Sequence, residues 1–349
     1  MPRITAQTPV PDSGLDSETA REIFDQIDRF AGYGFNKSHA AAYAAISFQT
    51  AWLKTHYPED FFAAAMNMDL DSVDDIARFA DEIKKRDIPL RKPSINQSNA
   101  RFRPCELTRP HKGHRYGITY ALEAIRGVGR AAATAIETER DVNGPFRSFE
   151  DLTNRMDGQV NRTALRALAK AGAFDPVGLG RGEALARAED RLSSAAATGQ
   201  MSMFDALIDD ATVSVAELDN DTTLDNELSV LGHYMSDHPL RGMKGRVRFR
   251  DAVLSLTKPP RSTRMAAIPT KIDVRRTNAG DIMAVITLSD PDGLFEALVF
   301  GDAWEDMRHQ VKKGARLLLD MNVSDRGHDR RFFIAQAHPI RQRHDAVAA

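Results

Sequence analysis

The chain has 349 residues, of which 42% are apolar, so it is long enough for two or three domains that each bury a core. The net charge of -2 does not by itself indicate a nucleic-acid partner, and the single cysteine, Cys105, excludes a disulfide framework and a cysteine-based metal site within one chain. The N-terminal residues lack the apolar core of a signal peptide and no segment is apolar for long enough to span a membrane, so we expect a cytoplasmic protein without a membrane partner.

The first third of the chain is predicted to be helical after a flexible lead-in at residues 1–14. One helix is indicated by apolar residues at helical spacing, namely Ile23, Phe24, Ile27 and Phe30. A second is expected from near Ser38 to just before Pro58. A third follows an aspartate-rich cap, and its apolar face is formed by Ile76, Phe79, Ala80 and Ile83. Residues 88–118 are expected to be extended or looped, because four prolines exclude a long helix.

A candidate anion site lies where the second of these helices begins. Its residues are Asn36, Lys37, Ser38 and His39, ahead of an alanine-rich run. Unpaired N–H groups and the positive dipole end of a helix attract anions, and lysine and histidine add positive charge. The alternative is a capped core helix in which Lys37 is solvated and His39 is packed. The isolated motif favours this alternative, and phosphate binding is the more specific hypothesis.

A second motif reads Ile-Arg-Gly-Val-Gly-Arg at residues 125–130. Two glycines around one apolar residue favour a tight turn between two short helices, and the backbone of such a turn can closely approach another backbone. The second helix would begin at Arg130 with its N–H groups directed outward. This arrangement is a helix-hairpin-helix, which is typical of binding to the phosphate backbone of duplex DNA without base readout. The alternative is an ordinary helix turn that stops at a glycine, and the motif favours DNA binding over it.

A short peptide, Gln-Met-Ser-Met-Phe at residues 200–204, ends this helical region. Gln200 with Met203 and Phe204 can fill a pocket on the surface of a partner, because two large apolar side chains follow a polar one at short spacing. The alternative, that Met203 and Phe204 belong to the preceding core, fits the residues equally well. The polar setting favours docking, since exposed Phe and Met beside an acidic stretch need a partner.

The stretch after this peptide is acidic and the next one is basic. Residues 205–227 hold eight acidic residues and no basic one, which suits a solvated linker more than a packed element. Between Arg241 and Arg276 there are eleven Lys or Arg residues and two Asp residues. The basic charge suits nucleic acid.

From Ala266 onward the apolar period is two, which predicts strands within residues 268–276, 281–290, 295–300, 315–324 and 331–339. A helix is expected at residues 302–314. Five strands with a helix after the third is the order of an OB-fold barrel. The chain is therefore predicted to be α+β and multidomain, helical over its N-terminal two-thirds and a five-stranded barrel beyond. Such barrels bind single strands through charge and stacking aromatics, but the aromatics here fit a core equally well, namely Phe295, Phe300, Trp304, Phe332 and Phe333.

No residue is predicted to be catalytic or to bind a metal ion. The sequence has no Walker loop, no dinucleotide fingerprint and no spacing that pairs a nucleophile with its base.

Together these stretches resemble the alpha subunit of bacterial DNA polymerase III, in its replicative form. The resemblance is carried, in the family's order, by GYGFNKSHAAAYAAISFQTAWLKTHYPEDFFAAAMNMD, KPSINQSNARF, YGITYALEAIRGVGRAAATAI, GPFRSFEDL and VNRTALRALAKAGAFD. It runs from about Leu15 to about Phe204 and resumes at LGHYMSDHPL and the barrel, so it covers nearly the whole chain.

The resemblance implies a domain map. Residues 15–115 would be the C-terminal part of the polymerase fingers. Residues 116–204 would be the helix-hairpin-helix domain, which binds duplex DNA and ends in the peptide that binds the sliding clamp. Residues 205–235 would be the acidic linker, and residues 236–345 the OB domain, which in the family lies near the single-stranded template.

The resemblance also implies roles for the motifs. Asn36, Lys37, Ser38 and His39 would face the triphosphate of the incoming deoxynucleotide. The residues that would bind the DNA backbone are Arg126, Gly127, Val128, Gly129 and Arg130. Those that would bind the sliding clamp are Gln200, Met203 and Phe204. The implied partners are duplex DNA, single-stranded DNA at the OB domain, the sliding clamp and the other subunits of the polymerase III holoenzyme.

The family's palm domain carries acidic metal ligands, and no stretch of this sequence resembles it. Nucleotidyl transfer needs two Mg²⁺ ions held by carboxylates about 4 Å apart. The complete polymerase therefore implies Mg²⁺, whereas this chain alone is expected to bind no cofactor and to be inactive.

Three functions are compatible with the sequence. The first is a C-terminal portion of the replicative polymerase that by itself only binds. The second is a fragment that synthesises DNA when paired with a separately encoded palm half. The third is a stand-alone, non-catalytic nucleic-acid-binding protein with helix-hairpin-helix and OB domains.

Overall fold

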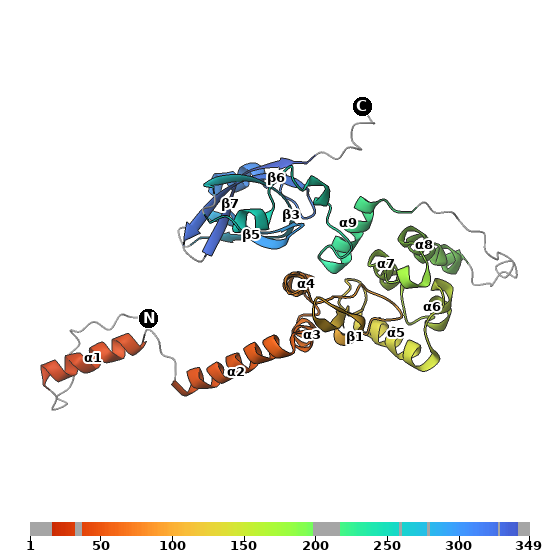
Figure 1. Ribbon diagram of the computed structural model, residues 1–349, viewed down its shortest axis with the longest axis horizontal. Coiled ribbons are helices and arrows are strands. Elements are labelled where there is room, and N and C mark those ends of the chain that lie inside the picture. Colours follow the sequence, from red (N-terminus) through yellow and green to blue (C-terminus); the bar gives the residue numbers. More distant parts are fainter. Residues whose placement is uncertain are drawn as a thin grey trace. The chain divides into compact units, whose positions relative to one another are not determined.

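The computed structural model describes residues 16–31, 37–197, 217–257, 260–277, 280–326 and 329–340 (Figure 1). The chain divides into two compact units, Met1–Pro58 and Glu59–Ala349. The expected lead-in at residues 1–14 lies outside the described residues.

The described part of the first unit consists of two helices, α1 (Ser17–Ala31) and α2 (Lys37–His56). The predicted second helix is confirmed, because α2 begins next to Ser38 and ends before Pro58. No residue of α2 is buried, and Phe48, for example, is 70% exposed. These two helices therefore show no apolar core of their own within the described residues.

The second unit begins with a helical body at residues 59–231. One hydrophobic core runs through it, from Phe62 to Leu231. Its elements are α3 (Pro58–Met68), α4 (Val73–Lys85), β1 (Arg103–His111), β2 (His114–Thr119), α5 (Arg130–Asn143), α6 (Phe149–Arg155), α7 (Arg162–Lys170), the 3-10 turn η1 (Asp175–Val177), α8 (Arg181–Ala197) and α9 (Asn220–Leu231).

The apolar face predicted for the third helix is confirmed in α4. Ile76 and Ile83 are fully buried, and Ala80 is 9% exposed. Ser72 caps the helix, because its side chain accepts a hydrogen bond from the backbone N–H of Asp75. The aspartates before α4 thus mark its start.

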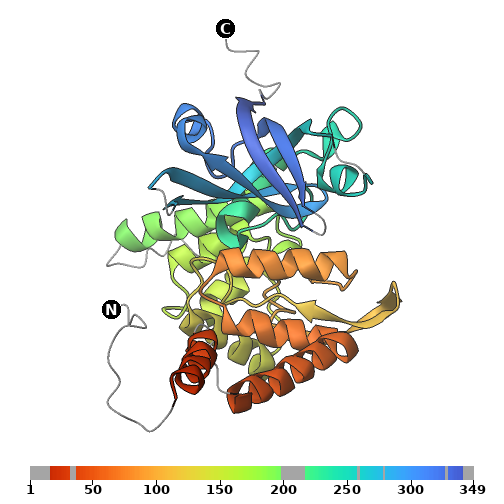
Figure 2. The same cartoon turned by 90° about the vertical axis from the view of Figure 1, so that its left-hand side faces the viewer.

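The segment expected to be extended contains an antiparallel hairpin of β1 and β2 (Figure 2, light orange). Lys112 and Gly113 form its turn, both with positive φ angles, of 46° and 93°. Beside this turn, His114 contacts the Glu59 carboxylate through Nδ1 at 2.7 Å. The hairpin is thereby held against α3.

The acidic stretch was expected to be a solvated linker, and this is wrong for its second half. Residues 220–231 form α9, in which Leu224, Leu228 and Leu231 are buried at helical spacing. The Asp219 side chain accepts a hydrogen bond from the backbone N–H of Thr222 at 2.7 Å and so caps the helix. The high acidic content of this stretch led to the linker prediction, although its leucines form an apolar face that packs against the rest of the helical body.

The C-terminal part of the second unit is a closed barrel, drawn in blue in Figure 2. The segment that leads into it contains η2 (Arg241–Met243) and α10 (Arg250–Leu254). The barrel elements are β3 (Ser262–Arg276), β4 (Ile282–Asp290), β5 (Gly293–Phe300), α11 (Gly301–Met307), β6 (Leu317–Arg326) and β7 (Asp329–Pro339).

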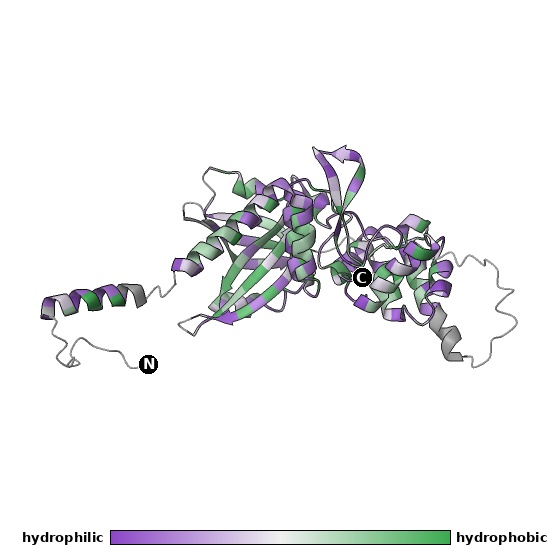
Figure 3. Cartoon of the chain, turned by 90° about the horizontal axis from the view of Figure 1, so that it is seen from below, coloured by the Kyte–Doolittle hydropathy of each residue, from purple (hydrophilic) through white to green (hydrophobic). Residues whose placement is uncertain are grey.

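The barrel strands follow the order β3-β4-β5-β7-β6, and β6 pairs with β3 to close it. β5 and β7 are parallel, the other pairs are antiparallel, and α11 follows the third strand. This is the OB-fold arrangement that the sequence predicted. Residues along β5 alternate between buried and more exposed positions. Figure 3 shows hydrophobic and hydrophilic residues mixed along the barrel strands. The α+β class, helical first and a barrel last, is confirmed.

Candidate nucleic-acid interface

The Ile125–Arg130 motif forms a turn directly before α5, as predicted, but no helix precedes it. Ile125 N–H donates to the carbonyl of Leu122 and Val128 N–H to that of Ile125, so residues 121–128 are successive turns. The reason is burial: residues 120, 121, 122, 124 and 125 are all buried. A regular helix directs one face to a core, whereas consecutive turns let neighbouring residues all point inward.

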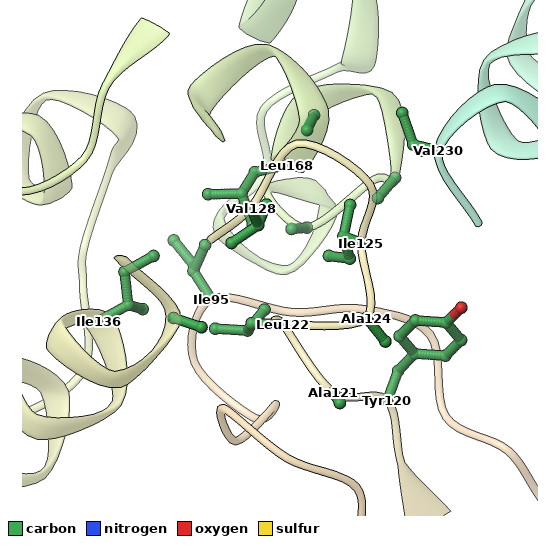
Figure 4. Packing of buried hydrophobic residues seen from close by; sticks show 14 of the residues in the cluster. Ile95, Tyr120, Ala121, Leu122, Ala124, Ile125, Val128, Ile136, Leu168 and Val230 are labelled. Atoms are coloured by element: carbon green, nitrogen blue, oxygen red, sulfur yellow. The ribbon is translucent and has the colours of Figure 1, made fainter. Parts of the chain in front are cut away.

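The apolar residue of the motif fixes the turn in the core. Val128 is 4% exposed, and its side chain points to the same cluster as those of Ile125 and Leu168 (Figure 4). Leu168 belongs to α7, so the turn rests on that helix. The Val128 side chain is therefore part of the core, and the DNA contact predicted at residue 128 stays a prediction.

The two glycines of the motif differ in what surrounds them. Gly127 has a φ of 103°, and a Cβ there would lie 3.2 Å from the Cβ of Ala167. The fold itself therefore requires glycine at 127. Gly129 is the N-cap of α5 with a φ of -73°, and a Cβ there would meet no atom within 4 Å. Within the described residues no steric contact requires glycine at 129, although glycine is also a favoured N-cap residue.

The N-terminus of α5 is open. Its N-cap is a glycine without a capping side chain, and its first turn holds no acidic residue. The positive end of the helix dipole is thus not neutralised by residues of the helix itself. Gly129 and Arg130 are exposed at this end.

The two arginines beside the glycines are held in place. The backbone N–H of Arg126 donates to the carbonyl of Val230 at 2.9 Å, which joins the turn to α9. The Arg130 side chain is 68% exposed, and its Nε donates to Oε1 of Glu123 at 2.6 Å. This hydrogen bond and the charge of Glu123 raise the pKa of Arg130. The guanidinium is therefore oriented through one nitrogen.

Glu123 also lies near a second arginine, Arg101, with 4.0 Å between its Oε2 and the arginine Nε. Arg101 is 50% exposed, and the Glu123 side chain is only 8% exposed. Neither Arg101 nor Glu123 is among the residues predicted from the sequence to bind a ligand. The two meet through tertiary packing, so no local pattern could have indicated the pair.

The outer face of the barrel carries a groove of about 790 Å³ across β4, β5 and β7. Arg275, Arg330 and Arg331 are among its lining residues. Of the barrel aromatics, Phe300 is 44% exposed and stacks on Phe333, with 6.0 Å between ring centroids. The others are core residues, namely Phe295, Trp304 and Phe332. Asp251 and Glu296 also line the groove, so basic, acidic and aromatic side chains share this part of the barrel surface.

The remaining predicted residues lie elsewhere or outside the described residues. Lys37, Ser38 and His39 form the exposed first turn of α2, where the His39 ring lies 4.4 Å from that of Tyr43. Asn36 lies outside the described residues, as do Gln200, Met203 and Phe204.

Within the described ranges, no group of three or more His, Cys, Asp or Glu side chains could hold a metal ion. Among the same residues, no helix has the length and apolar character that crossing a membrane requires.

Comparison with known proteins gives matches over most of the chain. The family model of the helix-hairpin-helix motif matches residues 87–184. The DNA polymerase III subunit alpha of Caulobacter vibrioides is 34% identical and aligns with 97% of this chain and 30% of its own length. That of Thermus aquaticus is 36% identical and aligns with 93% of this chain and 27% of its own length. The chain thus spans less than a third of the length of these curated relatives.

Among solved structures, the SSB domain of a Synechococcus sp. protein resembles the chain with a TM-score of 0.21 and 9% identity. It covers 24% of this chain and 99% of its own. At this score the likeness adds no weight to the assignment, which rests on strand order.

Proposed function

Because this chain is homologous to the C-terminal region of the DNA polymerase III alpha subunit, we propose that it supplies DNA-binding parts of a replicative DNA polymerase. Its helix-hairpin-helix binds duplex DNA, its OB barrel binds the single-stranded template, and residues 200–204 tether it to the sliding clamp. The protein would act in the cytoplasm with the other holoenzyme subunits.

The observation that carries this proposal is the exposed glycine at the open end of α5. The described residues leave room for a side chain at 129, and glycine there keeps the N–H groups at the start of α5 unhindered. A phosphate of the DNA backbone fits, because it can approach the unhindered N–H groups and the positive dipole end. Arg126 and Arg130 flank this point with positive charge. Such contacts read no bases.

The barrel supports binding of a single strand through a different chemistry. The stacked pair of Phe300 and Phe333 offers a surface for bases, and the arginines of the groove offer charge for phosphates. Both lie on the outer face, because β5 and β7 pair at Leu298 and Phe333, and Leu298 also lines the groove.

The nucleotide-facing role of Asn36, Lys37, Ser38 and His39 is proposed by homology alone. Lys37 and His39 would neutralise part of the charge of a deoxynucleotide triphosphate at the start of α2. The described residues offer no cluster that fits the two Mg²⁺ ions of nucleotidyl transfer.

The proposal is tested by titrating the protein with a fluorescent 20-base-pair duplex at several salt concentrations. We expect binding that is independent of sequence and that weakens steeply with salt, since each neutralised phosphate adds about 0.9 to the slope of log affinity against log salt. Affinity that is flat between 50 and 200 mM salt would exclude backbone binding at the hairpin.

A further inference from the structure

We propose that the duplex-binding surface extends beyond the hairpin to Arg101, and that Glu123 is a positioning residue that holds Arg101 and Arg130 for two phosphates of the DNA backbone. This inference rests on the proposed function, because it adds residues to the same surface. It is carried by the geometry of one nearly buried carboxylate between two exposed guanidinium groups.

Glu123 uses one oxygen for each arginine. Its Oε1 accepts from Nε of Arg130 at 2.6 Å, and its Oε2 lies 4.0 Å from Nε of Arg101. The Arg130 contact is a hydrogen bond through Nε and the Arg101 contact is a longer ion pair, so terminal nitrogens remain accessible to a ligand on both exposed guanidinium groups. Those nitrogens form the edge with which arginine binds phosphate oxygens in pairs.

The side chains of Arg101, Arg130 and Glu123 differ in their exposure to solvent. Arg101 and Arg130 are 50% and 68% exposed, whereas Glu123 is 8% exposed. A phosphate that approaches this surface therefore meets the arginines and not the carboxylate. The trio keeps a net charge of +1, so Glu123 orients the arginines without cancelling their attraction for an anion.

The backbone on both sides of Arg101 is fixed, which makes the residue suitable for a defined contact. The N–H of Ala100 donates to Oε2 of Glu137 at 2.7 Å. The N–H of Phe102 donates to Oδ1 of Asn67 at 2.9 Å, and Nδ2 of Asn67 donates back to the carbonyl of Phe102. Arg101 therefore projects from a rigid segment, and no ordering of the backbone is needed when its side chain binds.

The chain offers a matched control in Arg115. This arginine is 71% exposed and donates from Nε and Nη2 to Oε1 of Glu106, which is 60% exposed. It lies on the β1–β2 hairpin and has a pair of its own, so its removal changes net charge by the same amount as removal of Arg101. The two arginines differ in position and in the exposure of their acidic partners.

The experiment measures duplex binding by fluorescence anisotropy over a salt series, with the full chain and its variants Arg101→Ala, Arg130→Ala and Arg115→Ala. We expect Arg101→Ala and Arg130→Ala each to weaken binding about two- to fivefold, as for an exposed ion pair. Each should also reduce the salt slope by about one, the signature of a lost phosphate contact. Arg115→Ala should keep the slope.

The positioning role of Glu123 is tested with the near-isosteric Glu123→Gln, alone and in the Arg101→Ala/Arg130→Ala background. We expect Glu123→Gln to weaken duplex binding in the otherwise unaltered chain and to cause no further loss in the double variant, because it acts through the arginines. Circular dichroism melting checks that the variants fold.

Three results would overturn the inference. The first is an Arg101→Ala slope equal to that of the unaltered chain. The second is tighter binding by Glu123→Gln, which would make the carboxylate a competitor of DNA. The third is an equal Glu123→Gln loss in both backgrounds. Failure of the unaltered chain to bind duplex DNA would instead overturn the proposed function together with this extension.

Discussion

The Asp81 carboxylate on α4 accepts a hydrogen bond from the backbone N–H of Leu294 in β5, with 3.0 Å between Oδ1 and N. Lys84 lies about one helical turn after Asp81 on α4, and its Nζ donates to the carbonyl of Pro291 at 3.1 Å. The helical body thus contacts the β4–β5 turn of the barrel through polar groups. The two parts keep separate hydrophobic cores.

Gly293 is required by this contact. A Cβ at 293 would lie 2.0 Å from Oδ1 of Asp81, and the backbone there has a φ of 138°. We expect Gly293→Ala to lower the free energy of unfolding by about 1–3 kcal/mol, through strain and displacement of Asp81. Urea unfolding measures this. Gly242→Ala, at a site with no atom within 4 Å, serves as the control. Equal stability of the two variants would refute the argument.

The two hairpin glycines should separate folding from DNA binding. We expect Gly127→Ala to lower stability by about 1–3 kcal/mol, because its φ is positive and Ala167 is close. We expect Gly129→Ala to leave stability within about 1 kcal/mol, since it loses only a preferred N-cap residue. Its duplex affinity should nevertheless fall about tenfold, the loss of one hydrogen bond to a charged group. Thermal melting and anisotropy report the two effects, and unchanged affinity of Gly129→Ala would contradict the proposed contact.

The barrel and the body could be predicted from the sequence to different degrees. The period of two from Ala266 onward predicted every barrel strand, because each strand buries alternate residues. α9 was missed because its charge count concealed the spacing of its three buried leucines. The pairing of Arg101 with Glu123 depends on how the segment before β1 packs beside the hairpin turn, which no local pattern encodes.

Glu227 is expected to be a large contributor to stability. Its carboxylate is fully buried and accepts hydrogen bonds from Nη1 of Arg181 at 2.8 Å and from the backbone N–H groups of Met235 and Ser236. Burial opposes its ionisation, but the hydrogen bonds from Ser236 and Arg181 outweigh burial and lower its pKa. We expect Glu227→Ala to cost about 3–5 kcal/mol, because Arg181 then loses its buried partner.

The control for Glu227→Ala is Glu106→Ala, which removes the exposed partner of Arg115 and should cost less than about 1 kcal/mol. Chemical denaturation of both variants gives the comparison. A cost for Glu227→Ala as small as that of the control would mean that the buried pair contributes nothing.

The pH dependence of stability should carry opposite contributions from Asp290 and His238. Burial raises the pKa of Asp290 to about 6, so its contribution is present below the unfolded pKa and is lost as pH rises through 6. Burial lowers the pKa of His238 to about 3, so its contribution is present above the unfolded pKa of 6.5 and is lost as pH falls. The two oppose each other between about pH 4 and pH 6.

Replacing Asp290 with Asn removes the first contribution. The free energy of unfolding of Asp290→Asn should therefore fall more steeply than that of the unaltered chain as pH is lowered from 6 to 4. Urea titrations at pH 4, 5 and 6 measure this slope, and Asp281→Asn at an exposed position is the control. Parallel slopes for Asp290→Asn and the unaltered chain would show that Asp290 titrates normally.

The clamp-binding peptide is tested at Met203 and Phe204. Replacing both with alanine should abolish binding to a sliding clamp, because apolar residues that fill a pocket each contribute more than about 2 kcal/mol. Met201→Ala, in the same peptide, should retain binding. Surface plasmon resonance with immobilised clamp measures the affinities. Retained binding by the double variant would assign the tether to another segment.

The long strand β3 pairs with two neighbours in succession, with β6 over Ser262–Ala267 and with β4 over Ile268–Arg276. The seam with β6 joins the first barrel strand to the fourth, so it closes a long loop of chain and should form late, after the local β4–β5 hairpin. Until that seam forms, the nascent barrel presents unpaired strand edges. A newly synthesised chain is then most prone to aggregate with other chains through these edges. This risk ends once the barrel has closed.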